Sequence, residues 1–326
     1  MNKYKLQSFF TILVICLVLL PTPTRANQVD DTIYNKRLAL YKKTEAITQL
    51  PWYFIAAIDQ YERQIHKDLP DDQLISIKIP DILWYGVGNS SNIQDEKVIT
   101  LFQGKGKDGN GDGKADINDP EDILYTMAQI ILEFGPTEDD VKIGLWNYYQ
   151  RELTVQTIKN TARVFKKFQH VHLTDRDFPV SLQHNYSYRS TFGDRRGFGG
   201  LRSHEGTDIF ANYGTPVKST TYGVVEMLGW NLYGGWRIGI RDIYNIYHYY
   251  AHLNGYADDL KLGDIVKPGD VLGSVGSSGY GPPGTSGKFP PHLHYGMYKD
   301  NGYNEWAFDP YPYLRRWEKM ARSKNK

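Results

Sequence analysis

The sequence predicts a multidomain α+β protein, in which a helical region is followed by a mostly antiparallel β region. Three observations carry this prediction. Apolar residues recur at helical spacing in several segments between about residues 30 and 170. Beyond about residue 175, short alternating segments separated by Gly- and Pro-rich turns replace them. A length of 326 residues is sufficient for two regions with their own hydrophobic cores.

The first 26 residues have the features of a secretory signal peptide. Lys3 and Lys5 precede a nearly unbroken apolar run over residues 9–20, and Ala26 offers a cleavage position. The run is shorter than the roughly 20 residues that cross a bilayer, so cleavage is favoured over an uncleaved anchor, which would be the only membrane contact. The single cysteine, Cys16, lies inside this run. We therefore expect an exported, extracytoplasmic mature protein that needs no disulfide.

Residues 27–175 are predicted to form the helical domain. The stretch "LPWYFIAAIDQYERQI" (50–65) places apolar residues at helical spacing after a proline start signal. The stretch "PEDILYTMAQIILEFG" (120–135) begins with proline and acidic residues and ends at glycine, as a capped helix does. The stretch "TVQTIKNTARVFKKFQ" (154–169) carries one apolar stripe, which is typical of a helix that packs on one face.

Residues 176–326 are predicted to form the β domain, with the boundary at about 175–180 near "TDRDFPV". Its expected strands include "TPVKST", "GVVEML", "WRIGIRDI" and "IYHYYAHL". The whole chain has a formal net charge of only +1 at pH 7. Because no strong positive charge is present, no nucleic-acid partner is expected.

Histidines and one aspartate of the β region have the spacing of a metal site. His204 and Asp208 lie four residues apart in "RSHEGTDIF", and His292 and His294 lie two apart in "HLH". Since alternate residues of a strand face the same way, the two histidines project together while Leu293 points into the core. Catalytic zinc takes three His or carboxylate ligands and keeps a fourth position open. His204, Asp208 and one histidine of the pair would supply that set.

A further histidine, His252, stands near the end of "YYAHL". Together with the histidine of the pair that does not bind metal, it would serve as general base or as stabiliser of a tetrahedral intermediate. His248 fits no position in this set. We interpret it as a surface or structural histidine.

These motifs resemble the lysostaphin-type (LytM-like) zinc endopeptidases of bacterial cell walls. The resemblance spans about residues 185–310 and rests on "SHEGTD", "TPVKSTTYGVV", "YYAHL", "LGDIVKPGDVLGSVGSSG" and "HLHY". It implies a mostly antiparallel sheet with a groove walled by loops, peptidoglycan as the partner and one zinc ion per chain. By position it implies a set of zinc ligands, His204, Asp208 and His294, and two catalytic residues, His252 and His292. The loop "SSGYGPPGTSGKFPP" departs from the short form common in that family by an insertion around "YGPPG".

The helical region resembles lytic transglycosylases over about residues 45–165, which implies a lysozyme-like domain. Glu62 stands at the position of that family's catalytic glutamate, followed by Arg63 where the family usually has Ser or Thr. The stretch "IKIPDILWYG" resembles its proline-containing strand-like segment, and "LWNYYQ" resembles its late Tyr/Asn motif. Glu62 is therefore a candidate glycan-site residue. The alternative interpretation is a solvated helix residue in a domain that only grips glycan.

The stretch "DGNGDGKADIND" also fits a calcium-binding loop. The residues at loop positions 1, 3, 5, 6, 9 and 12 are Asp108, Asn110, Asp112, Gly113, Asp116 and Asp119. The last ligand would be an aspartate instead of the usual bidentate glutamate. A Gly- and Asp-rich surface turn without metal is the alternative.

The length and domain order of the whole chain resemble sporulation endopeptidases of bacilli that cut the L-Ala–D-Glu bond of peptidoglycan. This implies a zinc-dependent endopeptidase of cell-wall or spore-cortex remodelling, located in the wall or between the forespore and mother-cell membranes. Two alternatives are a cross-bridge endopeptidase that cuts between D-Ala and diaminopimelate, and a non-catalytic wall-binding scaffold or activator. Non-catalytic members usually lack a zinc ligand or a catalytic histidine. This chain keeps all five residues, which favours the enzyme.

Overall fold

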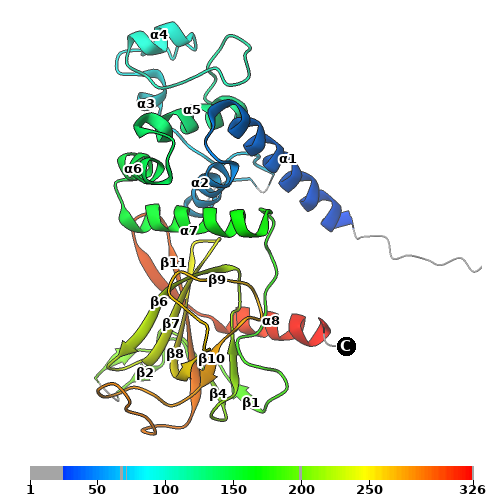
Figure 1. Ribbon diagram of the computed structural model, residues 1–326, viewed down its shortest axis with the longest axis vertical. Coiled ribbons are helices and arrows are strands. Elements are labelled where there is room, and N and C mark those ends of the chain that lie inside the picture. The colour runs from blue at the N-terminus through cyan, green and yellow to red at the C-terminus, as the bar shows by residue number, and fades with distance from the viewer. Residues whose placement is uncertain (1–24, 67–68, 71, 198–199, 325–326) are drawn as a thin grey trace, which may run out of the picture.

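The computed structural model describes residues 25–66, 69–70, 72–197 and 200–324, with side chains from residue 32 onward, and places a helical region above a β-sheet (Figure 1). The predicted signal segment falls almost wholly on residues 1–24, outside the described residues. The helices that precede the sheet are α1 (Arg25–Thr48), α2 (Trp52–Ile65), α3 (Asp81–Tyr85), α4 (Glu96–Leu101), α5 (Pro120–Ile131), α6 (Glu138–Tyr149) and α7 (Glu152–Phe168), with a 3-10 turn at Leu132–Phe134.

The predicted helices form where their start signals stand. α2 begins directly after Pro51, and α5 has Pro120 as its first residue with the Asp119 carboxylate accepting the next two free backbone N–H groups. α7 confirms the third predicted helix. The expected strand-like segment at residues 77–86 contains no strand, because residues 77–80 are irregular and Pro80 precedes a short helix, α3, with Asp81 in its first turn.

The β region consists of one large antiparallel sheet and a separate two-stranded sheet formed by β2 and β3. The central order of the large sheet is β1-β4-β11-β8-β7-β6-β9, with β12 beside β11, and with β10 pairing both β8 and β5. The four strand segments named from the sequence are confirmed as β5 to β8. The strands are β1 (Tyr186–Tyr188), β2 (Arg195–Arg196), β3 (Arg202–Ser203), β4 (Thr207–Ala211), β5 (Pro216–Lys218), β6 (Gly223–Asn231), β7 (Gly235–Asp242), β8 (Ile246–Tyr256), β9 (Ile265–Val266), β10 (Val271–Val275), β11 (His292–Asp300) and β12 (Glu305–Phe308).

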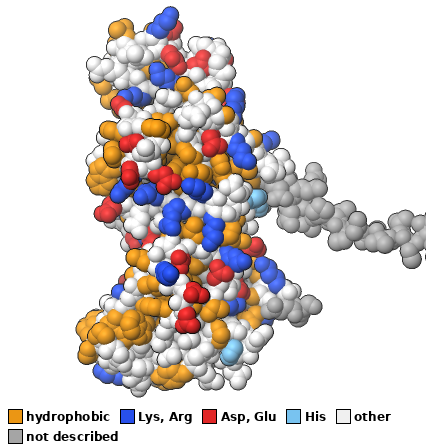
Figure 2. Space-filling view, viewed as in Figure 1, with side chains coloured by type: hydrophobic (Ala, Val, Ile, Leu, Met, Phe, Trp, Pro, Cys, Tyr) orange, Lys and Arg blue, Asp and Glu red, His pale blue; other side chains and the backbone are white. Residues whose placement is uncertain are grey.

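Helix α7 lies across one end of the sheet and joins the two regions (Figure 1). Val224 and Ile243 of the β region are buried in the same apolar cluster as the cores of α2, α5 and α7. Asn160 of α7 donates to the Glu226 carboxylate at 2.8 Å, and Arg163 donates to a loop carbonyl of the β region at 2.6 Å. Acidic and basic side chains gather at this junction (Figure 2). The two regions are therefore packed against each other through shared core and polar contacts.

A C-terminal helix, α8 (Tyr311–Lys324), packs against the sheet (Figure 1). The β region has a second cluster of buried apolar side chains. It includes Leu314, Trp317 and Ala321 of α8 together with Tyr295 of β11. This helix was not predicted from the sequence. Among the described residues, no helix has both the length and the apolar character that crossing a bilayer requires.

Candidate metal centre and active site

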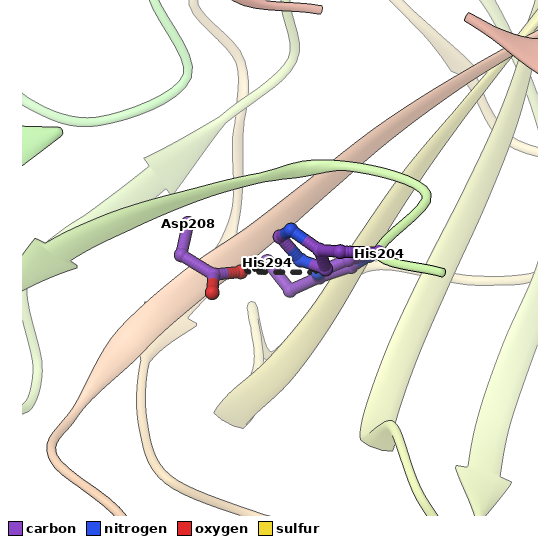
Figure 3. A group of neighbouring side chains, drawn as sticks. All are labelled: His204, Asp208 and His294. Atoms are coloured by element: carbon purple, nitrogen blue, oxygen red, sulfur yellow. Dashed lines mark hydrogen bonds and ion pairs between the residues drawn. The ribbon is translucent and has the colours of Figure 1, made fainter. Parts of the chain in front are cut away.

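Strands β4 and β11 bring two of the predicted metal ligands side by side. The two strands are antiparallel, and Asp208 is the direct cross-strand partner of His294. His204 stands in the turn between β3 and β4, where its backbone N–H donates to the carbonyl of Asp194 at 3.0 Å. The three side chains point toward one another (Figure 3). Two residues far apart in the chain thus meet through sheet register, and the third is delivered by the turn before β4.

The donor atoms of these three side chains form a compact triangle. His204 Nε2 lies 2.9 Å from His294 Nδ1 and 3.0 Å from Asp208 Oδ1, and His294 Nδ1 lies 3.1 Å from Asp208 Oδ1. Among the described residues, three His, Cys, Asp or Glu side chains come close enough to share a metal ion only here. All three side chains are largely buried, and the cluster that they form lies at the base of a groove.

The other two predicted histidines stand beside this triangle. Their ring centres are 4.8 Å apart, and that of His252 lies 6.0 Å from that of His294. Each ring is fixed by a backbone carbonyl: His252 Nδ1 lies 2.8 Å from Ser278 O, and His292 Nδ1 lies 2.9 Å from Pro290 O. A proton on Nδ1 therefore satisfies the carbonyl and leaves the Nε2 lone pair available as a base.

Burial and mutual contacts control the charge of the cluster. Burial alone would raise the pKa of Asp208, but hydrogen bonds with His204 and His294 hold that pKa well below its usual range. Burial lowers the pKa of His294 and of His292. Burial, followed by the neighbouring His292 and His294, lowers the pKa of His252 to about 3. The site thus favours a carboxylate beside neutral imidazoles, which are the forms that bind metals.

Backbone geometry at His252 is unusual. Its φ is +62°, a left-handed value that costs a non-glycine residue of the order of 1–3 kcal/mol. Its backbone N–H donates to the carbonyl of Gly234 at 2.8 Å, which holds the strand in this shape. The residue therefore leaves the regular alternation of β8, and its ring faces the groove.

A contact that the sequence did not reveal is made by Arg196 of β2. Its Nη2 donates to Asp208 Oδ2 at 2.6 Å, while Asp208 Oδ1 belongs to the donor triangle. His204 Nδ1 lies 2.8 Å from the carbonyl oxygen of Thr191, which fixes the ring so that Nε2 enters the triangle. Outer contacts of this kind orient metal ligands. The doublet "RR" carried no signal that would have singled out Arg196.

The cluster opens into a groove of about 560 Å³. All five predicted histidine and aspartate residues line it, together with loop side chains from Tyr280 and Phe289 and from Arg202 and Lys288. Leu293 is fully buried on the other face of β11, as the strand alternation predicts.

His248 has a structural place, and the surface half of its interpretation is wrong. The side chain is fully buried, with Nε2 3.1 Å from Asp242 Oδ2 and Nδ1 2.6 Å from the Tyr295 hydroxyl. Tyr295 is the neighbour of His294 and faces the other side of the sheet. His248 therefore lies behind the site and not in it.

Glu62 is buried, so its interpretation as a solvated residue is wrong. It is 3% exposed, accepts from the Tyr149 hydroxyl at 2.6 Å and lies 2.8 Å from His66 Nε2. Arg63 points elsewhere and pairs with Asp59 at 3.0 Å. Tyr149 belongs to the stretch "LWNYYQ", so two of the resemblance segments do meet. A role of Glu62 toward glycan stays a prediction.

The acidic loop is organised by its own backbone. Asp108 accepts from the N–H groups of Gly111 and Gly113, Asn110 accepts from that of Asp112, and Asp119 caps α5. Asp116 accepts from the N–H of Asn118 at 2.9 Å. These bonds account for the residue types without a metal. Calcium binding at this loop stays a prediction.

Comparison with known proteins agrees with this geometry. The model of "Peptidase family M23" matches residues 202–310, which contain all five predicted site residues. A Bacillus subtilis protein named L-Ala--D-Glu endopeptidase is 56% identical over 326 residues, covering 98% of this chain and all of that protein. Lysostaphin of Staphylococcus simulans is 38% identical over 114 residues, which are 34% of this chain and 21% of lysostaphin.

Among solved structures, the catalytic domain of lysostaphin from Staphylococcus simulans is 34% identical. The alignment covers 42% of this chain and 98% of that domain, with a TM-score of 0.32. The family match covers the β region, and the Bacillus subtilis relative matches the helical region as well. The chain is therefore a peptidase and belongs to peptidase family M23.

Proposed function

We propose that the protein is a zinc-dependent peptidoglycan endopeptidase that cuts the L-Ala–D-Glu bond of stem peptides. The observation that carries this proposal is the buried His–Asp–His triangle flanked by two histidines at the base of a groove. The choice of bond rests on the relative that is 56% identical along the whole chain and carries that name.

The three donors fit zinc in kind and in spacing. Two imidazole nitrogens and one carboxylate oxygen are a common catalytic zinc set, and donors 2.0–2.1 Å from a tetrahedral ion lie about 3.3 Å apart. The donor spacings of 2.9 to 3.1 Å are close to this value. His204, Asp208 and His294 would hold one zinc ion. Bound zinc would supply a Lewis acid that polarises the scissile carbonyl and makes water acidic enough to attack at neutral pH.

The remaining histidines handle protons. His292 Nε2, which lies 3.8 Å from Asp208 Oδ1, accepts the proton of the attacking water and returns it to the leaving amine. His252 faces the same groove, beside the oxygen that gains negative charge. Because its Nδ1 proton is held by the Ser278 carbonyl, it would donate to that oxygen from Nε2 only after taking the second proton of the attacking water, which then leaves on the product amine. The Ser278 and Pro290 carbonyls keep both rings oriented toward the substrate.

The setting of the enzyme follows from the same proposal. We place a signal peptide at residues 1–26, a helical glycan-gripping domain of lysozyme-like type at 27–175 and the peptidase domain at 176–326. The protein would act outside the cytoplasmic membrane, in wall or spore-cortex remodelling. The contacts of α7 with β6 and with the loops of the sheet support a fixed distance between a glycan-holding surface and the cutting site.

Mass spectrometry of purified peptidoglycan after digestion with the zinc-loaded protein tests the proposal. We expect new amines on D-Glu and muramic acid that carries only L-Ala, because hydrolysis leaves these two ends. A chelated sample and His292→Ala protein are the controls. New free D-Ala carboxylates and diaminopimelate amines, the two ends that cutting the cross-bridge leaves, would indicate the cross-bridge endopeptidase. Zinc-loaded protein that releases no amine from any wall preparation would instead indicate a scaffold.

Gly206, between His204 and Asp208, provides a test of the metal centre. A Cβ atom there would lie 2.6 Å from His294 Cε1 and 2.7 Å from the Tyr295 carbonyl oxygen. We expect Gly206→Ala to displace the His294 ring and to weaken zinc binding about 10–100-fold, as the loss of a ligand-orienting contact does. Competition with a fluorescent chelator measures the affinity. Gly255→Ala, where the added Cβ meets no atom within 4 Å, is the matched control, and equal affinities in both variants would contradict the prediction.

A further inference from the structure

The insertion around "YGPPG" forms a fixed wall of the groove. The backbone N–H of Gly279 donates to the Thr285 carbonyl within the loop, and that of Gly281 donates to the Leu232 carbonyl in the turn between β6 and β7. The Trp230 indole N–H donates to the Gly281 carbonyl at 3.1 Å. A Cβ at Gly279 would lie 2.2 Å from the Tyr233 carbonyl oxygen, so loop and turn are in direct contact. The loop therefore presents its side chains from a defined position.

Tyr280 of this loop gathers two cations at the groove. Arg202 Nη2 donates to the Tyr280 hydroxyl, and Lys288 Nζ donates to the Tyr280 carbonyl at 2.7 Å. The Arg202 guanidinium also stands over two tyrosine rings, 5.7 Å from the centre of Tyr280 and 5.9 Å from that of Tyr233. Both cations are exposed, and both line the groove.

The two cations lie close to the reacting centre. The Tyr280 ring is stacked on His252, with centres 6.1 Å apart and an interplanar angle of 18°. Arg196, the third basic residue lining the groove, already contacts Asp208 and His204. An ammonium has three N–H donors and a guanidinium has five, and Tyr280 takes one from each. Because both side chains are exposed and line the groove, Arg202 and Lys288 can also donate to an anion that enters it.

The proposed substrate carries a suitable anion. A glutamate whose amine is acylated by alanine has two carboxyl groups, and at most one of them continues the peptide. The other is a free carboxylate in the residue on the amine side of the cut. We propose that Arg202 and Lys288, positioned by Tyr280, form a subsite that binds this carboxylate. The subsite rests on the proposed function and gives the loop insertion a role in substrate choice.

Two soluble stem peptides test the subsite. They differ only in that the free glutamate carboxylate of one is a carboxamide in the other. We expect the zinc-loaded wild-type protein to cut the carboxylate peptide with a kcat/KM about tenfold higher, because hydrogen bonds to ionised groups are stronger than neutral ones. The preference should shrink in 0.5 M salt, since the two cations are exposed.

The Arg202→Gln, Lys288→Gln double variant should bring the ratio of the two kcat/KM values to about one. The matched control is Arg189→Gln with Lys261→Gln, two exposed residues outside the groove lining, and it should keep the wild-type ratio. Zinc content and circular dichroism check the fold of each variant. The single Lys288→Gln variant, which changes only an exposed side chain, should show a partial loss of preference.

The outcomes separate the subsite from the function. Equal cleavage of both peptides by the wild type overturns the subsite and leaves the endopeptidase standing. A ratio that stays at tenfold in the double variant assigns the preference to other residues and also overturns it. If wild-type protein cuts neither peptide, the proposed bond is wrong and the subsite falls with it.

Discussion

His294→Ala is expected to abolish both zinc binding and hydrolysis, whereas His252→Ala keeps zinc and loses turnover. His294 supplies one corner of a triangle with edges of 2.9 to 3.1 Å, and its removal leaves only two donors. The affinity should fall by more than the 10–100-fold that loss of an outer contact costs. His252 lies outside the triangle, with its Nδ1 bound to a backbone carbonyl. Its loss should lower kcat about 10²–10⁴-fold, as removal of a proton-handling group does.

Metal analysis and thermal unfolding separate these two effects. A zinc ion that binds only the folded protein raises its melting temperature, so wild type and His252→Ala should both be stabilised by added zinc and His294→Ala should not. His184→Ala, which alters an exposed histidine outside the groove, is the control and should behave as wild type. If His252→Ala loses its zinc, the division of the five residues into ligands and proton-handling groups is wrong.

Local signals in the sequence predicted local structure well. Pro51 and Pro120 predicted the starts of α2 and α5, and the alternating segments predicted strands β5 to β8. These signals act within a few residues, because capping and strand alternation are short-range effects. The docking of α7 on the sheet was not predictable in the same way. Val224 and Ile243 look like ordinary strand residues, and only the fold shows that they share a core with the helices.

In the candidate site, too, short-range sequence patterns were informative and long-range contacts were not predictable. The spacings of "HEGTD" and "HLH" predicted the candidate residues, but not that Asp208 would stand directly across from His294 in the sheet. The contacts of Arg196 and of Arg202 were missed because their partners lie 12 and 78 residues away. The partner of Arg63 was not evident from its position next to Glu62 in the sequence. Adjacent helix residues do not face each other, so Arg63 pairs with Asp59 one turn back and not with Glu62.

Breaking the ion pair between Arg151 and Asp300 on one side only is expected to destabilise the protein strongly. Arg151 precedes α7, and its guanidinium makes two hydrogen bonds, 2.7 and 2.9 Å long, to the fully buried carboxylate of Asp300 at the end of β11. Asn245 also donates to that carboxylate at 3.2 Å. Asp300 lies six residues from His294 on the same strand, about 20 Å at the usual strand rise. The pair thus connects the helical region to the strand that carries the site.

Arg151→Met should lower the free energy of unfolding by about 3–5 kcal/mol, because it leaves a buried carboxylate without its cation. Urea denaturation of the wild type and the variant, followed by circular dichroism, measures the difference. Adding Asp300→Leu to Arg151→Met should recover much of the loss, since the unpaired charge is then gone. Lys105→Met breaks a pair with Glu133 in which both side chains are more than 40% exposed, and should cost about 1 kcal/mol or less. A similar small cost for Arg151→Met would mean that the helical region is held to the sheet mainly by the apolar contacts of α7, and that the buried pair sets only its orientation.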